Sequence, residues 1–234
     1  MSKELYPLEG VYHTFELPDG KFIEGVWDHR PVMHHYNFPI SGKTLADVGC
    51  RDGLFSWHFE KIGAEVTGYD IIDRPMRRML QNEYGAKFKF KHMNVFELYE
   101  EPQNAYDIVF CSDVLQHLEN PLGALRLMHH ITKERAYFVV DLHPALKDRG
   151  CVSNDPLLPW HWGPEYFLRL VSLAGFSNPQ WLSAFNVSGT MYPTRDVGIL
   201  TAEADPSFSY QGLLGGPLWA STTAGDLKRT HRVE

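Results

Sequence analysis

Apolar residues between positions 43 and 205 follow two alternating periodicities. Short runs rich in β-branched and aromatic residues predict strands, and stretches with apolar residues three and four positions apart predict the helices between them. The strands are expected at residues 44–49, 65–70, 87–95, 106–113 and 136–143, and the helices at 53–62, 74–84, 121–131 and 164–175. Because a parallel crossover passes a helix over the sheet, this order predicts an α/β fold with a doubly wound, mostly parallel sheet.

Two more strands, at residues 181–187 and 197–204, follow the last helix. Only turn residues connect them, so an antiparallel pair is expected, which completes a Rossmann-like, seven-stranded sheet with an antiparallel closing strand. Near the N-terminus, Pro18-Asp19-Gly20 separates two β-prone runs and predicts a hairpin cap. The expected domains are an N-terminal cap and connector at 1–40, a core at 41–204 and a C-terminal tail or lid at 205–234.

Composition and charge narrow the class of protein. The chain of 234 residues has 44% hydrophobic and 22% charged residues, which is typical of a globular domain, and its formal net charge is -7. This acidic balance argues against a nucleic-acid partner, since phosphate contacts need a surplus of lysine and arginine. The three cysteines form no CxxC pair, and no apolar run has signal-peptide or membrane-spanning length, so a cytoplasmic protein without a membrane partner is expected. No HExxH motif occurs, and no metal site is expected.

The first strand ends in a glycine turn of the kind that begins many nucleotide sites. Asp47, Gly49 and Gly53 lie at this turn, where missing side chains let a ligand approach the backbone at the start of a helix. The dinucleotide fingerprint G-x-G-x-x-G is not matched, because Arg51 takes the second glycine position, and no Walker motif follows. Asp70 ends the next strand, where a carboxylate can accept both hydroxyls of a ribose. The expected ligand is a nucleoside without phosphate.

This turn and three later blocks resemble the class I S-adenosylmethionine-dependent methyltransferases. The first motif of that family, a strand ending in D-x-G-C-G-x-G, stands here as DVGCRDG at residues 47–53, and Asp70 is the acid that ends the second strand. Asn94-Val95 ends the third strand, and YDIVFCSDVLQHLENP at residues 106–121 forms the fourth-strand block. The resemblance covers roughly residues 40–200 and implies S-adenosyl-L-methionine as the cofactor.

Within this family, the chain looks similar to the carboxymethyl-uridine tRNA transferases and their small-molecule relatives. The stretches that carry this likeness are VLQHLENPLGAL at residues 114–125, LLPWHWGPEYFLRLVSLAGF at 157–176 and GVWDHRPVMHHYNF at 25–38. The lysine with which those tRNA enzymes grip the extra carboxylate of carboxy-S-adenosylmethionine is missing, and His34 and His35 lie nearby. The resemblance therefore favours plain methyl transfer.

The resemblance also implies cofactor contacts for individual residues. These are Gly49 and Gly53 for the methionine part, Asp70 for the ribose, Ile71 and Val95 for the faces of adenine, Asn94 for its amino group, and Ser112 or Asp113 for the ammonium or sulfonium side. The remaining members of the expected cofactor site are Asp47, Cys50, Arg51, Cys111, Trp27 and Arg30.

Several of these residues have a structural alternative. Asp47 and Asp70 could cap a following helix or turn, and for Asn94 a turn role and an adenine contact weigh equally. Arg51 departs from the family pattern, and it is tolerated if its φ is negative, with a side chain that meets the cofactor carboxylate or points to solvent.

Methyl transfer from a sulfonium needs little acid-base machinery, because the electrophile is already activated. An oxygen nucleophile would still benefit from a base, and His143, which follows the fifth strand, is the first candidate. Asp113, His117 and His13 are the further candidates, although His117 also fits a packing role. The aromatic residues expected to exclude water from the transferring methyl are Tyr12, Trp27, Tyr36 and Trp160, of which Trp160 also fits the core, like Trp162.

The sequence thus favours a methyltransferase that modifies an oxygen or nitrogen of a small-molecule acceptor. A tRNA-modifying methyl or carboxymethyl transferase is the rival within the enzyme class, and the acidic balance opposes it. A non-catalytic protein that binds S-adenosylmethionine as a partner subunit is the rival from another class, because Arg51 alters the glycine turn. The sequence indicates neither the acceptor nor the oligomeric state.

Overall fold

The computed structural model describes residues 10–152, 160–190 and 194–208. One compact unit of the chain ends at Ala204, and a second unit begins at Asp205. Only residues 205–208 of the second unit are described, so the predicted tail or lid lies almost wholly outside the described residues. The first unit holds both the predicted cap and the predicted core.

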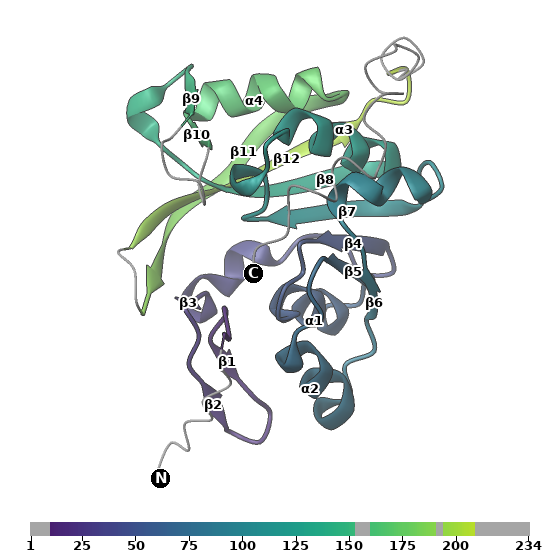
Figure 1. The fold of residues 1–234 in the computed structure, drawn as a ribbon, viewed down its shortest axis with the longest axis vertical. Coiled ribbons are helices and arrows are strands. Elements are labelled where there is room, and N and C mark those ends of the chain that lie inside the picture. The colour runs from purple at the N-terminus through teal and green to yellow at the C-terminus, as the bar shows by residue number, and fades with distance from the viewer. Residues whose placement is uncertain (1–9, 153–159, 191–193, 209–234) are drawn as a thin grey trace. The chain divides into compact units, whose positions relative to one another are not determined.

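Five parallel strands form one side of an eight-stranded sheet (Figure 1). In spatial order they are β6 (Lys89–His92), β5 (Glu65–Asp70), β4 (Thr44–Val48), β7 (Tyr106–Ser112) and β8 (Thr132–Asp141). The central strand β4 is buried continuously from Leu45 to Val48, as expected for a parallel strand that helices cover on both faces. Strand β8 starts at Thr132, four residues before the predicted start at residue 136. The prediction missed these residues because Lys133 and Glu134 are polar and exposed, so this part of the strand has no apolar pattern.

Three antiparallel strands complete the sheet beyond β8. They are β12 (Arg195–Ala204), β11 (Phe176–Gly189) and β3 (Trp27–Asp28), in that order from β8 outward. The predicted parallel sheet with an antiparallel closing strand is confirmed, and β3, from the cap, adds an eighth strand at the edge. Strand β11 begins earlier than predicted, and a register shift between Ser177 and Gln180 accommodates Pro179, which has no N–H to donate.

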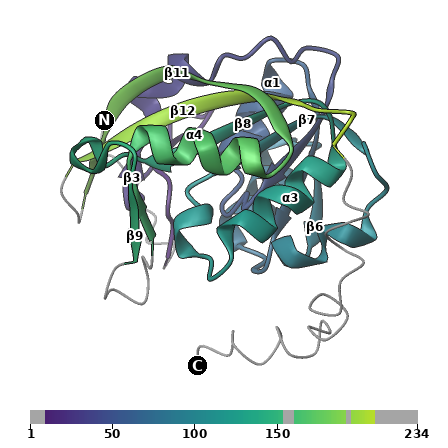
Figure 2. The same cartoon turned by 90° about the horizontal axis from the view of Figure 1, so that it is seen from above.

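Within the described residues, four α-helices cover the two faces of the sheet. They are α1 (Leu54–Lys61), α2 (Pro75–Tyr84), α3 (Pro121–Ile131) and α4 (Pro164–Leu173). Proline opens the last three, where its missing N–H would have no helical partner in any case. One core cluster joins α1, α2 and the cap on one face, and a second joins α3 and α4 on the other. Figures 1 and 2 show how these helices are arranged about the sheet.

The predicted N-terminal hairpin is present as β1 (Phe15–Glu16) and β2 (Phe22–Ile23), and the 3-10 helix η1 (Arg30–Tyr36) follows β3. The turn between β1 and β2 is closed by the N–H of Gly20, which donates to the carbonyl of Leu17 at 2.9 Å. A second antiparallel pair, β9 (Gly150–Val152) with β10 (Trp160–Trp162), was not predicted. The other short 3-10 helices are η2 (Val95–Glu100), η3 (Leu115–His117) and η4 (Pro144–Leu146). None of the helices in the described ranges has the length and apolarity needed to cross a membrane.

Candidate functional site

The carboxyl ends of the parallel strands bring the predicted site residues to one edge of the sheet. The turn after β4 is left-handed at Gly49 and Gly53, with φ of 80° and 85°. A Cβ on Gly49 would lie 2.1 Å from a methyl carbon of Val114, so a side chain there would meet both backbone strain and a steric clash. A Cβ on Gly53 would likewise lie 2.8 Å from the ring of Phe88, so packing within the chain and the left-handed backbone both require glycine at these two positions.

Asp47, Cys50 and Cys111 are buried behind this edge. The hydroxyl of Ser56 donates to the Asp47 carboxylate at 2.5 Å, which ties α1 to β4. Burial raises the pKa of Asp47 to about 7, and the Ser56 hydrogen bond opposes the shift. Burial also raises the pKa of both thiols well above the ordinary value. The geometry gives these three side chains packing roles, and their predicted cofactor contacts stay predictions.

Arg51 differs from the sequence expectation in its backbone. Its φ is 48°, in the left-handed region, and not the negative φ that was the condition for tolerating arginine at this position. Its guanidinium lies over the ring of Tyr12, 4.0 Å from the centroid, and therefore contacts the cap. The neighbouring carboxylate of Asp52 accepts hydrogen bonds from the backbone N–H groups of Tyr12 and His13. Arg51, which replaces a glycine of the family motif, and its neighbour Asp52 thus attach the N-terminal segment to the turn.

Asp70 ends β5 beside this turn. Its carboxylate accepts the N–H of Arg51 at 2.9 Å on one oxygen and the N–H of Ile72 at 2.9 Å on the other. This is the predicted capping alternative, and each oxygen keeps a second lone pair for a hydroxyl donor. The adjacent Ile71 is 52% exposed, which presents an apolar side chain next to an acidic group. An acid and an apolar surface beside a bare turn fit the sugar and the base of a nucleoside.

Asn94 has a clear structural role at the carboxyl end of β6. Its side-chain oxygen accepts the N–H of Phe96 at 3.0 Å, and its own N–H donates to Glu97 at 2.9 Å. This reciprocal pair is a capping box that starts η2. Val95 is the next residue and is buried. The turn role of Asn94 is present, while its adenine contact and that of Val95 stay predictions.

Asp113 lies just after β7 and is joined to Arg195 by a two-point ion pair, with N–O distances of 2.6 and 2.8 Å. Ser112 donates to the same carboxylate at 3.0 Å, and Gln116 lies 3.4 Å from it. The guanidinium and the hydroxyl outweigh burial and lower the pKa of Asp113 to about 2. A carboxylate with this pKa and four donors is a weak proton acceptor, which disfavours the predicted role of Asp113 as a base.

Arg195 and Asp141 belong to the site although the sequence carried no motif for either. Arg195 also donates to Asp141 at 2.7 Å, and its guanidinium lies over the ring of Trp27, 4.4 Å from the centroid. Burial and the charge of Asp113 raise the pKa of Asp141 to about 6. Trp27 therefore contacts the ion pair from the cap. Arg30, predicted beside it, donates instead to Asp28 at 2.7 and 2.9 Å and lies over Phe22 within the cap.

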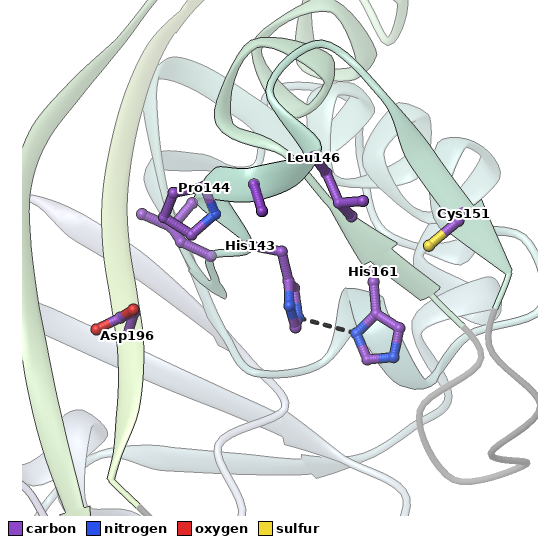
Figure 3. A pocket seen from close by; sticks show the side chains of 8 residues that line it. His143, Pro144, Leu146, Cys151, His161 and Asp196 are labelled. Atoms are coloured by element: carbon purple, nitrogen blue, oxygen red, sulfur yellow. Dashed lines mark hydrogen bonds between the residues drawn. The ribbon is translucent and has the colours of Figure 1, made fainter.

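The three predicted histidines lie in different surroundings. His143 faces a cavity of about 430 Å³ and shares a hydrogen bond of 2.8 Å with His161, a residue that the sequence analysis missed (Figure 3). His13 is 4% exposed and packs edge-on against His29 with ring centroids 5.2 Å apart, and burial lowers its pKa well below the usual value. His117 is exposed at the end of η3.

Several of the aromatic residues predicted around the site belong to the core. Trp162 is fully buried, and its ring lies 6.3 Å from that of Trp160. Tyr36 is fully buried as well, against Phe55, with ring centroids 4.6 Å apart. Across the described ranges, no three histidine, cysteine, aspartate or glutamate side chains come together in a way that could hold a metal ion.

Comparison with known proteins shows which family the chain matches. A family described as "Methyltransferase domain" matches residues 32–178. The ubiquinone biosynthesis O-methyltransferase of Bordetella bronchiseptica is 33% identical over 164 residues, which are 66% of this chain and 64% of that protein. The enzyme of the same name from Pseudomonas paraeruginosa is 32% identical over 96 residues, which are 40% of this chain and 41% of that protein.

A solved structure shares the fold. The N-terminal domain of EvdMO1, crystallised with S-adenosylhomocysteine and D-fucose, superimposes with a TM-score of 0.64 and 15% identity, over 84% of this chain and 92% of that chain. At this identity the likeness concerns the fold alone. The chain spans less than two thirds of the length of the two curated relatives. The family match, by contrast, extends from the cap through α4 and contains every parallel strand. The chain therefore belongs to the methyltransferase-domain family.

Proposed function

We propose that this protein transfers a methyl group from S-adenosylmethionine to a hydroxyl oxygen of a small-molecule acceptor. The observation that carries the proposal is the similarity to O-methyltransferases at 33% identity over 164 residues, in a chain whose family match contains the whole parallel sheet. Of the two nucleophiles expected from the sequence, this similarity favours oxygen over nitrogen. A cytoplasmic location is part of the proposal.

The cofactor would lie at the carboxyl ends of β4 and β5. We assign its ribose to the Asp70 carboxylate, its methionine part to the turn at Gly49 and Gly53, and one face of its base to the exposed Ile71. The fit rests on the remaining lone pairs of the Asp70 carboxylate and on the exposed apolar side chain of Ile71 beside it. When bound, S-adenosylmethionine supplies a methyl group already activated by the sulfonium charge.

The chain's own contribution is to hold the acceptor and to exclude water. The cap reaches this edge through Tyr12, which is anchored by Asp52 and covered by Arg51, and through Trp27, which packs on Arg195. Aromatic side chains at the mouth of the site would keep water from the transferring methyl. Positioning of this kind can supply most of the acceleration of an in-line displacement.

The test combines binding with turnover. Calorimetry of the full chain with S-adenosylmethionine is expected to show saturable binding, and incubation with a panel of phenols, catechols and amines is expected to give a product one methyl group heavier, identified by mass spectrometry. Absence of binding at millimolar cofactor would contradict the proposal. Binding without turnover on any acceptor would favour a non-catalytic partner protein, and methylation confined to the amines would contradict the choice of oxygen.

A further inference from the structure

The strongest feature outside the cofactor edge is the pair of imidazoles in the cavity of Figure 3. His143 follows β8 and His161 lies in β10, and Nε2 of His143 is 2.8 Å from Nδ1 of His161. The cavity of about 430 Å³ is within the size range of small-molecule sites. Its lining residues are Leu142, His143, Pro144, Ala145, Leu146, Cys151, His161 and Asp196.

The backbone connects this cavity to the carboxyl edge of the sheet. The N–H of Leu142 donates to the carbonyl of Asp196 at 2.9 Å, and the N–H of His143 donates to that of Trp162 at 3.3 Å. Asp141 and Arg195, which are joined by an ion pair, directly precede two lining residues in the sequence, Leu142 and Asp196. The cavity therefore begins just after β8 ends. Because successive side chains on a strand alternate between its faces, Leu142 and Asp196 lie on the opposite face of the sheet from Asp141 and Arg195.

The hydrogen bond between the rings restricts where their protons can be. One ring must donate and the other must accept, because a neutral imidazole carries one N–H and one lone pair. If Nε2 of His143 donates to Nδ1 of His161, then Nδ1 of His143 is left with a free lone pair and can act as a base.

The character of the walls indicates the class of acceptor. Four of the eight described lining residues are aliphatic, and none of the eight is lysine or arginine. Asp196 is the one acidic side chain among them, and it disfavours an anionic ligand. A neutral, largely apolar molecule with an acidic hydroxyl, such as a phenol or catechol, fits these walls best.

We propose that this cavity binds a neutral phenolic acceptor, that Nδ1 of His143 accepts the proton of its hydroxyl, and that His161 is the positioning residue that keeps His143 in this tautomer. The inference rests on the proposed function and deepens it. The acceptor oxygen forms the new O–C bond, the S–C bond breaks with its electron pair left on sulfur as a neutral thioether, and the hydroxyl proton goes to His143 and then to solvent.

The experiment compares variants of the pair with catechol as acceptor. His143→Gln is expected to lower kcat about 100-fold, the size typical of a lost general base, with KM for catechol changed less than about threefold. His161→Phe is expected to lower kcat about 10-fold or more, while His161→Asn, whose amide oxygen can still accept the Nε2 proton, recovers most of it. His130→Gln, in the last turn of α3 before the start of β8, is the matched control and stays at wild-type activity.

The pH profile separates a positioning role from a merely structural one. Burial and, after it, His161 lower the pKa of His143, so the wild-type rate is expected to rise through a pKa below 6.5 and then level off. Asp196 is the charged neighbour that opposes this shift, and Cys151 is the remaining ionisable lining residue. In His161→Phe the acid limb moves to higher pH. The positioning role of His161 would be overturned if His161→Phe lowered kcat without moving the acid limb of the pH profile, and if His161→Asn did not recover kcat.

A readout without cofactor completes the test. In the cofactor-free protein, ¹⁵N NMR of the His143 ring is expected to show the proton on Nε2, and catechol is expected to shift the signals of both rings. A proton on Nδ1, or rings that millimolar catechol leaves unmoved, would overturn the inference. Failure of the proposed function would instead appear as a wild-type protein that does not bind S-adenosylmethionine, whereas methyl transfer untouched by His143→Gln would reject this site alone.

Discussion

The carboxylate of Asp113 and the guanidinium of Arg195 meet through two hydrogen bonds, of 2.6 and 2.8 Å, although 82 residues separate them in the chain. Their side chains are 5% and 13% exposed, so both charges are largely withdrawn from water. Arg195 also pairs with Asp141 and covers Trp27, which links the ends of β7 and β8, the start of β12 and the cap. The pair therefore fixes the shape of the edge where the reaction is proposed to occur.

Removing Arg195 is expected to be strongly destabilising. Arg195→Gln leaves the carboxylates of Asp113 and Asp141 buried without their cation, and loss of one partner of a buried pair typically costs about 3–5 kcal/mol. Urea unfolding followed by circular dichroism measures this loss. The control is Arg169→Gln, whose pair with Asp148 is exposed and 3.9 Å long, and it is expected to change the free energy of unfolding by less than about 0.5 kcal/mol. Equal effects of the two substitutions would contradict the buried-pair account.

Asp47 is expected to make stability fall as the pH rises. Its pKa in the folded protein is about 7, raised by burial, while the unfolded value is near 3.8. Between these two pH values the folded state binds more protons at Asp47 than the unfolded state does. The stabilisation from protonated Asp47 is therefore fully present below pH 3.8, and it decreases as the pH rises toward the folded pKa of about 7. The slope is about 1.4 kcal/mol per pH unit for one group. Unfolding free energies measured from pH 4 to pH 8 test this.

Asp47→Asn provides the comparison for that titration. The amide oxygen of asparagine can still accept the Ser56 hydroxyl, and it does not ionise. The difference in unfolding free energy between the wild type and Asp47→Asn is therefore expected to shift in favour of the variant as the pH rises toward 7. A difference that stays constant over this range would show that Asp47 ionises normally in the folded protein.

The φ of 48° at Arg51 predicts different outcomes for two small substitutions. Arg51→Ala keeps the left-handed strain and loses the contact with the ring of Tyr12, worth about 0.5–1 kcal/mol at an exposed site. Arg51→Gly loses the same contact but relieves the strain, which is about 1 kcal/mol for a residue with a Cβ. Gly is thus expected to be more stable than Ala by about 1 kcal/mol in thermal unfolding. An Ala variant as stable as Gly would mean that the left-handed conformation carries no cost.

Parallel strand order made part of the site predictable. A strand that ends in a glycine turn and a neighbouring strand that ends in an acid must bring both ends to one edge, and Asp70 does accept the N–H of Arg51 from that turn. The hairpin around Gly20 was predictable because its turn residues determine its geometry locally. The hairpin prediction needed only the local turn residues, and the prediction for Asp70 needed only the local sequence pattern and the common direction of parallel strands.

The contacts that the sequence did not reveal are those set by strand register. Arg195 reaches Asp113 and Asp141 because β12 runs antiparallel beside β8 and starts at the end where β8 finishes, with Val197 opposite Asp141. Nothing in the residues around position 195 carries that information. His161 was hidden in the same way, since it meets His143 only through the pair of β9 and β10, and strands of three residues are too short to give a strand signal.

Asp70 carries the most direct prediction for the cofactor. Asp70→Ala removes the proposed acceptor for the ribose hydroxyls and is expected to raise the dissociation constant of S-adenosylmethionine about 10- to 100-fold, as for lost hydrogen bonds to a charged group. Asp70→Ala also removes the acceptor of the Arg51 and Ile72 N–H groups, which can lower stability. Calorimetry is therefore performed at a temperature at which circular dichroism shows the variant to be folded. Glu65→Gln, at the exposed amino end of the same strand, is the matched control and should leave affinity unchanged. If Asp70→Ala bound the cofactor as tightly as the wild type, the carboxylate would be a turn cap only, and the ribose site would have to be sought elsewhere along the edge.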